Sequence, residues 1–301
     1  MRHTLAQPDC LVAASVYDPM SARIAADLGF ELGIMAGSVA AMTIAGAPDL
    51  ALVSMGELAE QVRRTCRASR LPVLIDADHG FGNALHVMRT VEELEAAGAA
   101  AVSIEDTRLP GVHGDSTAAL ISPDEMRGKL RAALAARQSS NLSLIARTSC
   151  VPIAGLEEAL RRAPLYDSLG VDAHMFVGLK TAAELETLAD CTTLPIILGG
   201  CAEEVLAAAR GGDFRVAMLV LGIHPYLATL KGAQTAYASL RQNQLPDPAL
   251  LASADLVRQL TRAADYRDWQ ADFLAHENAE VTWDWATQKP ATPDSNQCPN
   301  Q

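Results

Sequence analysis

Hydrophobic residues along the chain form short, nearly continuous runs, and each run is followed by a longer segment in which apolar residues recur at helical spacing. Runs of this kind, rich in Val and Ile, are typical of parallel strands buried on both faces. We therefore expect eight strands, at 10–15, 31–36, 72–78, 101–105, 142–148, 172–177, 195–199 and 215–222. Each is followed by an expected helix, at 19–28, 55–69, 84–97, 122–137, 155–169, 181–190, 202–209 and 225–242.

The alternation predicts an α/β fold, a closed (β/α)8 TIM-type barrel over residues 1–243. Eight strand–helix units in about 240 residues match the usual length of such a barrel. An open doubly wound sheet is the rival architecture. It seldom contains eight equal units, and no G-x-G-x-x-G motif follows the first strand.

A different pattern begins after the barrel. Residues 244–287 predict extra helices, at 248–263 and 266–276, and this stretch holds all three Trp residues of the chain. Aromatic side chains at such a density need a surface to cover them, and a partner subunit is a natural one, so we expect a C-terminal extension at a subunit interface. The last stretch, 288–301, is rich in Pro, Asn, Gln and Thr and is expected to be a disordered tail.

Composition excludes several classes of protein. The 301 residues carry a formal charge of −12, which argues against binding to nucleic acid, since that requires a basic face. No apolar run is long enough to cross a membrane, and the first residues lack a secretion pattern. The six Cys residues form no C-x-x-C pair, so we expect reduced thiols and a cytoplasmic location.

Acidic residues gather where the predicted strands end, which is where barrels of this kind carry out chemistry. Asp76 and Asp78 end the third strand, Glu105 ends the fourth, and Asp49 lies in the loop after the second. Carboxylates at this spacing repel one another unless a cation lies between them. An oxygen-only ligand set favours Mg²⁺, with Mn²⁺ possible. The alternative is that these acids cap helices or pair with arginines.

Three further polar residues stand near strand ends. Arg147 ends the fifth strand and is a candidate for binding a substrate carboxylate through two hydrogen bonds; the alternative is a structural ion pair with Glu105 or Asp106. His224 follows the eighth strand as a candidate acid or carboxylate ligand, or as a surface residue. Ser38, next to a glycine, is a weaker candidate for anion binding.

Five segments together resemble the isocitrate lyase/phosphoenolpyruvate mutase superfamily, most closely its bacterial oxaloacetate decarboxylase branch. They are Val16-Tyr-Asp-Pro-Met-Ser-Ala-Arg-Ile-Ala, Met35-Ala-Gly-Ser-Val-Ala, Asp76-Ala-Asp-His-Gly-Phe-Gly-Asn, Ile104-Glu-Asp-Thr and Ile145-Ala-Arg-Thr. The third segment is specific to the superfamily, whereas Ser38 and a His near the end of the eighth strand point to the branch.

The resemblance implies a Mg²⁺-dependent barrel that acts on a 2-keto acid. It implies that Asp76 binds the metal directly and that three other acids hold it through water: Asp49, Asp78 and Glu105. It also implies a homotetramer, a dimer of dimers that exchange a helix after the eighth strand.

For the substrate, the resemblance implies that Ser38 and Arg147 hold the C1 carboxylate and keto end, while His224 lies at the far carboxylate. The expected reaction is loss of CO₂ from oxaloacetate to give pyruvate.

Two other readings remain open. One is a retro-aldol carbon–carbon lyase acting on a 2-alkylmalate or a methylisocitrate-like acid. The other is a barrel without activity that serves as a binding or assembly module. The Lys-Lys-Cys-Gly-His lid of the isocitrate lyases is absent, because the corresponding stretch reads Arg108-Leu-Pro-Gly-Val-His-Gly-Asp115.

Overall fold

The structure is a computed structural model of the chain. It describes residues 1–5, 7, 9–114, 117–212 and 214–274, together with the backbone of 283–284 and 289–290. The chain divides into two compact units, Met1–Ala228 and Thr229–Gln301, which are treated separately below.

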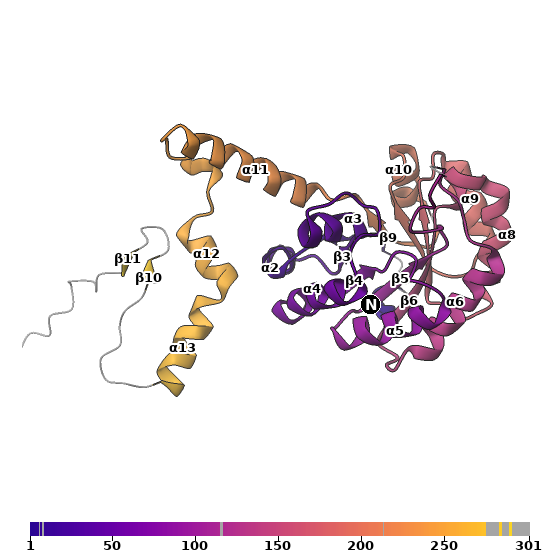
Figure 1. Cartoon of the computed structure of the whole chain (residues 1–301), viewed down its shortest axis with the longest axis horizontal. Helices are drawn as coiled ribbons and strands as arrows, with labels where there is room; N and C mark the ends of the chain where they lie inside the picture. The colour runs from indigo at the N-terminus through magenta and orange to yellow at the C-terminus, as the bar shows by residue number, and fades with distance from the viewer. Residues whose placement is uncertain are drawn as a thin grey trace, which may run out of the picture. The chain divides into compact units, whose positions relative to one another are not determined.

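The first unit is built around one parallel sheet in the order β1-β9-β8-β7-β6-β5-β4-β3-β2. The sheet closes because β1 and β2 are successive parts of one segment: β1 pairs with β9 and β2 pairs with β3. The result is the expected (β/α)8 barrel, which is confirmed (Figure 1). The strands are β1 (Leu11–Val12), β2 (Ala14–Ser15), β3 (Gly33–Met35), β4 (Val73–Asp76), β5 (Ala101–Glu105), β6 (Ser143–Thr148), β7 (Ala173–Val177), β8 (Ile196–Gly199) and β9 (Val216–Val220).

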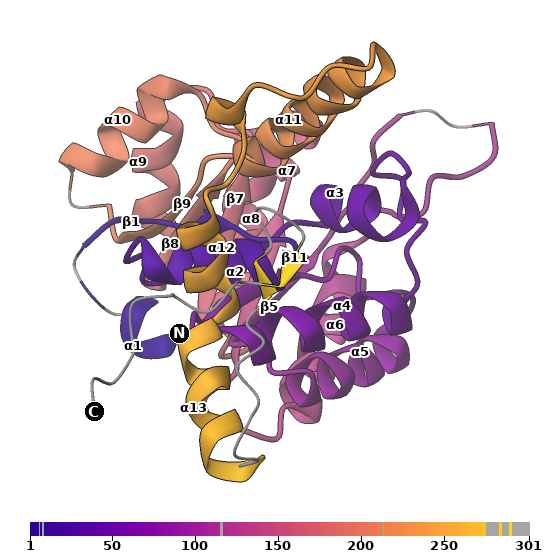
Figure 2. The same cartoon turned by 90° about the vertical axis from the view of Figure 1, so that its left-hand side faces the viewer.

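Helices surround the strands, as Figures 1 and 2 show from two sides. Several begin at a side chain that caps the free backbone amides; Asp18, Ser54 and Thr181 each form a capping box with the residue three positions on. The helices of the first unit are α1 (Arg2–Leu5), α2 (Pro19–Asp27), α3 (Gly37–Ala40) continuing into the π-helix η1 (Ala41–Ala45), α4 (Met55–Ala68), α5 (Ala84–Ala96), α6 (Pro123–Ala136), α7 (Cys150–Ala154), α8 (Leu156–Asp167), α9 (Ala182–Cys191), α10 (Glu203–Gly211) and the start of α11 (His224–Arg241).

Most predicted elements are present with ends shifted by a few residues. The third predicted strand runs two residues too far at its C-terminal end, because β4 ends at Asp76 and the chain then turns. The last barrel helix begins one residue earlier than predicted, at His224. The short helices α1, α3 with η1, and α7 were not predicted, because elements of four or five residues are too short to show helical periodicity.

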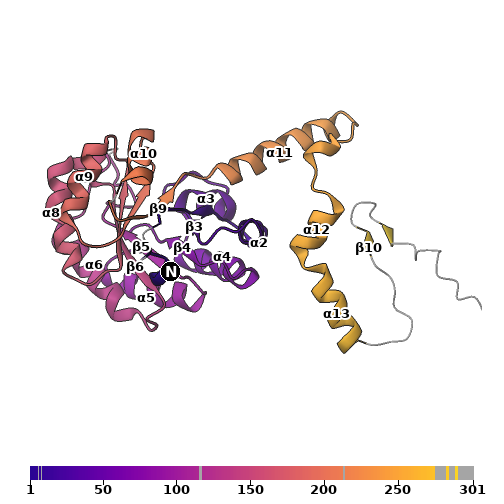
Figure 3. The same ribbon diagram turned by 180° about the vertical axis from the view of Figure 1, so that it is seen from behind.

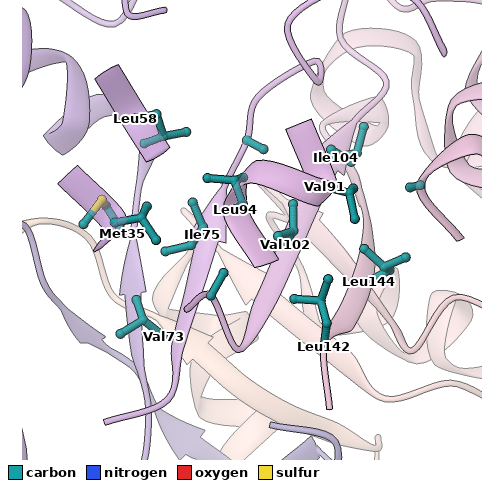
Figure 4. Close-up of a cluster of buried hydrophobic side chains, with 14 of the residues drawn as sticks. Met35, Leu58, Val73, Ile75, Val91, Leu94, Val102, Ile104, Leu142 and Leu144 are labelled. Carbon is teal, nitrogen blue, oxygen red and sulfur yellow. The ribbon is translucent and has the colours of Figure 1, made fainter. Parts of the chain in front are cut away.

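Side chains alternate between the two faces of each strand. Leu74 of β4 and Ile145 of β6 belong to an apolar cluster inside the barrel. Their neighbours, among them Val73, Ile75 and Leu144, belong to another cluster between the strands and the helix layer. Figure 4 shows this outer cluster, with side chains of α4 and α5 against those of the strands. The alternation decides which polar residues at the strand ends point inward.

The second unit contains the rest of α11, the 3₁₀ turn η2 (Pro248–Leu250), α12 (Ala254–Thr261) and α13 (Ala263–Phe273), which Figure 3 shows in succession. Two short strands, β10 (Trp283–Asp284) and β11 (Lys289–Pro290), pair antiparallel. The helix predicted at 248–263 is therefore two shorter elements. Most of the predicted tail, 288–301, lies outside the described residues. Among those that are described, no helix is long and apolar enough to cross a membrane.

Candidate active site

Three charged residues point into the barrel at the carboxyl ends of neighbouring strands. Asp76 has the same parity as the interior Leu74, and Arg147 the same parity as the interior Ile145. Glu105 is paired in register with Arg147. Alternation along β4, β5 and β6 therefore brings two acids and one arginine to the same end of the barrel, as the sequence predicts.

Arg147 binds the acids on both sides of it. Its Nη1 lies 2.6 Å from each carboxylate oxygen of Asp76, and its Nη2 lies 3.5 Å from Oε2 of Glu105. Burial alone would lower the pKa of Arg147, but the attraction of Asp76 and Glu105 outweighs it and raises that pKa above its usual value. The guanidinium thus stays charged and is the one cation described in contact with these acids.

Asp78 joins the group from the turn after β4, not from an extended strand as predicted. Its backbone φ is 47°, in the left-handed region, so the turn and not strand alternation aims its carboxylate. A Cβ added at Gly37 would lie 2.5 Å from Oδ1 of Asp78 and 3.5 Å from Oδ2 of Asp76, so both acids face the same glycine. Burial, and the charges of Asp76, Glu105 and Asp49 after it, raise the pKa of Asp78 to about 8.

Asp49 faces the same space from the loop after η1. It lines an open pocket of about 280 Å³ of empty space together with Asp76 and Asp78. Burial and the charge of Asp76 raise the pKa of Asp49. Apolar residues complete the wall of the pocket, among them Ala41, Val53, Leu58 and Phe81.

Ser38 stands at the start of α3, beside the acids. Its neighbour Gly37 donates its backbone N–H to Oδ2 of Asp76 at 3.2 Å. A Cβ at position 37 would lie 2.5 Å from Oδ1 of Asp78, so a larger residue would force that carboxylate to move. The sequence places this glycine at a strand end beside Ser38, and the structure shows that its backbone N–H bonds Asp76.

His224 lies at the same end of the barrel but apart from the acids. It is exposed and is the first residue of α11. Two residues on, the ring of Tyr226 packs edge-on against that of Tyr17, with centroids 5.0 Å apart, at the end of the first strand segment. Among the described residues, no hydrogen bond or ion pair joins His224 to the acid group. The structure therefore brings together Asp49, Asp76, Asp78, Glu105 and Arg147, places Ser38 beside them, and leaves His224 on the rim.

The arrangement suits a hydrated divalent cation. Four carboxylates face one guanidinium, which leaves an excess of negative charge when all are ionised. Within the described ranges, no three His, Cys, Asp or Glu side chains are spaced to bind one ion directly. Proteins usually hold Mg²⁺ by one or two carboxylates together with water, and these carboxylates would suit that mode of binding.

Comparison with known proteins identifies the family. The model of the phosphoenolpyruvate phosphomutase family matches residues 1–241. The chain belongs to the phosphoenolpyruvate phosphomutase family. It is 46% identical over 276 residues to an oxaloacetate decarboxylase of Bradyrhizobium diazoefficiens, covering 91% of this chain and 96% of that protein.

Two solved structures have the same fold. One is a phosphonopyruvate hydrolase in complex with oxalate and Mg²⁺, with a TM-score of 0.79, 26% identity, and coverage of 91% of this chain and 98% of that one. The other is the phosphoenolpyruvate phosphomutase of Streptomyces platensis subsp. rosaceus, with a TM-score of 0.81, 28% identity and the same coverages. The resemblance inferred from sequence motifs is thereby confirmed.

Cys150 and His174 lie in the core of the barrel and outside the site. Cys150 is fully buried, and burial and the charge of Asp106 raise the pKa of its thiol to about 12, which makes it a poor nucleophile. His174 is also fully buried and pairs through Nε2 with Asp167.

A buried polar group behind the site was not predicted. Oδ2 of Asp106 accepts hydrogen bonds from Thr148 at 3.1 Å, Arg162 at 3.0 Å and Tyr166 at 3.0 Å. Asp106 follows Glu105, and Thr148 follows Arg147, so these bonds tie together the ends of β5 and β6. The group joins residues up to 60 positions apart, which no local pattern reveals.

Proposed function

We propose that the chain decarboxylates oxaloacetate to pyruvate and CO₂ with the help of a divalent cation, Mg²⁺ or possibly Mn²⁺. The observation that carries the proposal is the inward-facing group of Asp76, Glu105 and Arg147 at the carboxyl ends of three adjacent strands. Relatives 46% identical over most of the chain are named oxaloacetate decarboxylase, and the phosphonopyruvate hydrolase above holds Mg²⁺ and oxalate.

In this proposal Asp76 binds the cation directly, and Asp49, Asp78 and Glu105 hold it through water. When bound, the cation supplies a Lewis acid for the charge that develops on the keto oxygen of the substrate. Burial and, after it, the charges of the neighbouring acids raise the pKa of Asp78. A cation bound among these acids would relieve their repulsion, which supports these roles.

Arg147 and Ser38 bind the C1 carboxylate and the keto end of the substrate. The guanidinium of Arg147 offers a planar pair of donors, which matches the two oxygens of a carboxylate. Fixing this end leaves the C4 carboxylate free to turn out of the plane of the keto group. The C3–C4 bond then aligns with the carbonyl π system, which accepts its electron pair as CO₂ departs.

One proton must then be delivered to C3 of the three-carbon product. His224, on the rim of the barrel, lies at the far carboxylate in this proposal and either donates that proton or orients a water molecule that does. Its exposed position gives it contact with solvent, so it can be reprotonated between turnovers.

The proposed activity is tested by supplying oxaloacetate to purified protein with Mg²⁺ or with EDTA and measuring pyruvate and CO₂ together. Equal yields of both products in the presence of Mg²⁺, above the uncatalysed rate, support the proposal. The same assay with 2-alkylmalates and methylisocitrate detects retro-aldol cleavage, which forms a keto acid without CO₂. If the protein cleaves those acids and does not release CO₂ from oxaloacetate, retro-aldol lyase activity replaces decarboxylation as the proposed function.

The proposal extends to a homotetramer, a dimer of dimers. In α11 the exposed apolar residues include Leu227, Leu230 and Tyr237, and in α13 Trp269 is 50% and Phe273 is 76% exposed. Exposed aromatic surface of this kind favours burial against another subunit. This supports exchange of the segment after β9 between subunits.

A further inference from the structure

The turn that carries Asp78 is held by three successive backbone carbonyls. The carbonyl of Asp78 accepts a hydrogen bond from the backbone N–H of Glu105 at 2.8 Å. The carbonyl of His79 accepts one from Nζ of Lys129 at 2.9 Å, and that of Gly80 accepts one from Oγ1 of Thr90 at 3.2 Å. The donors come from β5, α6 and α5, so each carbonyl is fixed by a different element.

These bonds oppose a backbone that would otherwise relax. Asp78 and Phe81 have φ values of 47° and 60°, which side chains with a Cβ rarely adopt. Strain of this kind persists only where the surroundings fix the conformation. The left-handed conformation of Asp78 is also what aims its carboxylate at Gly37 and Asp76.

The burial of Lys129 is unusual for a charged side chain, and packing alone does not account for it. It is 3% exposed, and its only hydrogen bond among the described contacts is to the His79 carbonyl, not to a carboxylate. Burying an ammonium costs free energy that an apolar side chain of the same length would avoid. Glu125 of the same helix attracts this charge most, and Glu105 of the acid group attracts it next. A buried cation behind the acids therefore offsets part of their repulsion.

Thr90 acts from the other side of the turn. It is 1% exposed and sits in the middle of α5, yet its hydroxyl bonds the Gly80 carbonyl instead of its own helix. The fit is close, because a Cβ added at Gly80 would lie 2.4 Å from Cγ2 of Val87, one turn before Thr90.

We propose that Thr90 and Lys129 are positioning residues that hold the Asp78 turn in its left-handed conformation and so fix the Asp78 carboxylate toward a divalent cation. The inference rests on the proposed function, in which Asp78 holds that cation through water. Neither residue needs to touch the substrate.

The variants Thr90→Val and Lys129→Met test this, because each nearly preserves side-chain shape while removing the donor. Thr65→Val is the matched control: Thr65 is also fully buried, but its hydroxyl bonds Gln61 within its own helix, α4. The first measurement is amide hydrogen exchange of peptides spanning 76–83 without metal. We expect exchange to rise about fivefold in Thr90→Val and about tenfold or more in Lys129→Met, and to stay unchanged in Thr65→Val.

The second measurement is Mg²⁺ affinity by calorimetry, without substrate. We expect the dissociation constant to rise by similar factors in Thr90→Val and Lys129→Met, and we expect Lys129→Met to have little further effect once Asp78→Asn is present. Faster exchange with unchanged Mg²⁺ affinity would assign the two residues a structural role only and overturn the proposal. Should Lys129→Met fail to fold, Thr90→Val alone decides between these results.

Measurements on the wild-type protein distinguish failure of the proposed function from failure of the positioning role. Wild type that neither binds Mg²⁺ nor releases CO₂ overturns that function, and the cation role of the turn with it. Wild type that does both, with variants that match Thr65→Val in both measurements, overturns the positioning role alone.

Discussion

Nη1 of Arg147 lies 2.6 Å from both carboxylate oxygens of Asp76, so the residue proposed to bind substrate and the residue proposed to bind the cation share one ion pair. The contact is largely shielded from water, since the two side chains are 18% and 9% exposed. A cation bound at Asp76 would compete with the guanidinium for the same oxygens and free Arg147 to bind a carboxylate. Cation and substrate binding are therefore expected to reinforce each other.

Replacing Asp76 tests this shared pair. In Asp76→Asn we expect Mg²⁺-dependent turnover to be lost, because the amide cannot supply the charge that a directly bound cation needs. The fold should survive, since Arg147 keeps Glu105 and the repulsion among the acids falls. Asp172→Asn is the control, because Asp172 also pairs with an arginine, Arg137, but at the opposite ends of the strands. Mg²⁺ activation that persists in Asp76→Asn would contradict the assignment.

The barrel and its inward-facing charges were predictable from the sequence, because both depend on local periodicity. β5 spans the predicted residues, and the placement of Asp76, Glu105 and Arg147 at one end follows from strand alternation. The family also follows from short motifs, and its model matches residues 1–241.

The parts that were missed depend on contacts between distant residues. The bonds of Thr90 and Lys129 to the Asp78 turn join helices to a loop 10 and 50 positions away. The turn conformation of Asp78 replaces the extended strand that alternation predicts, because a glycine-rich segment with tertiary support adopts φ values that local pattern cannot show.

Arg147→Lys is expected to raise KM for oxaloacetate strongly and to lower turnover. A lysine keeps the positive charge near Asp76 but cannot present two coplanar donors to a carboxylate. Steady-state kinetics at saturating Mg²⁺ measures the effect. Arg137→Lys makes the same change at the pair with Asp172 and should leave KM near its wild-type value. An unchanged KM in Arg147→Lys would remove the carboxylate-binding role.

Asp78 should make the stability of the metal-free protein depend on pH. Burial and neighbouring acids raise its pKa to about 8 in the folded state, above the ordinary value of 3.8. The folded state therefore binds this proton more tightly than the unfolded state, so its contribution to stability is lost as the pH rises from about 4 to about 8. We expect the Tm in EDTA to fall over this range through this group, and the rise in Tm on adding Mg²⁺ to grow with pH.

Asp78→Asn isolates that contribution, since an amide does not titrate. The variant should show a flatter dependence of Tm on pH in EDTA and a smaller response to Mg²⁺. A wild-type slope retained in Asp78→Asn would place the titrating group elsewhere.

The proposed assembly is tested by two truncations. Deleting the residues after Tyr266 removes Trp269 and Phe273, which are exposed in the described chain, as well as Trp283 and Trp285. Each buried aromatic contributes on the order of 150–250 Å² to an interface, so we expect this cut to dissociate the oligomer. Deleting only 288–301, a stretch of Pro, Asn, Gln and Thr with few apolar residues, should leave it intact. Light scattering distinguishes the two results, and dissociation by the shorter cut would contradict the interface assignment.

His224 offers the sharpest test of the reaction, because it lies apart from the acids. Among the described residues it makes no hydrogen bond or ion pair with Asp76, Asp78, Glu105 or Asp49, so a change there should not disturb the cation site. His224→Gln keeps a hydrogen-bond donor, but an amide does not act as a proton donor. We expect turnover of oxaloacetate to fall by about 10²-fold or more, which is what a positioned proton donor contributes.

The Mg²⁺ concentration that gives half-maximal activity should change little in the same variant, because the proposed ligands lie on and after β3, β4 and β5. His86→Gln is the control, since His86 is also exposed at the first turn of a barrel helix, α5, but bonds only its neighbour Asn83 among the described contacts. A matching loss of metal activation and turnover in His224→Gln would mean that His224 supports the fold of the barrel end. Unchanged turnover of oxaloacetate would show that His224 neither donates the proton nor orients the water that does.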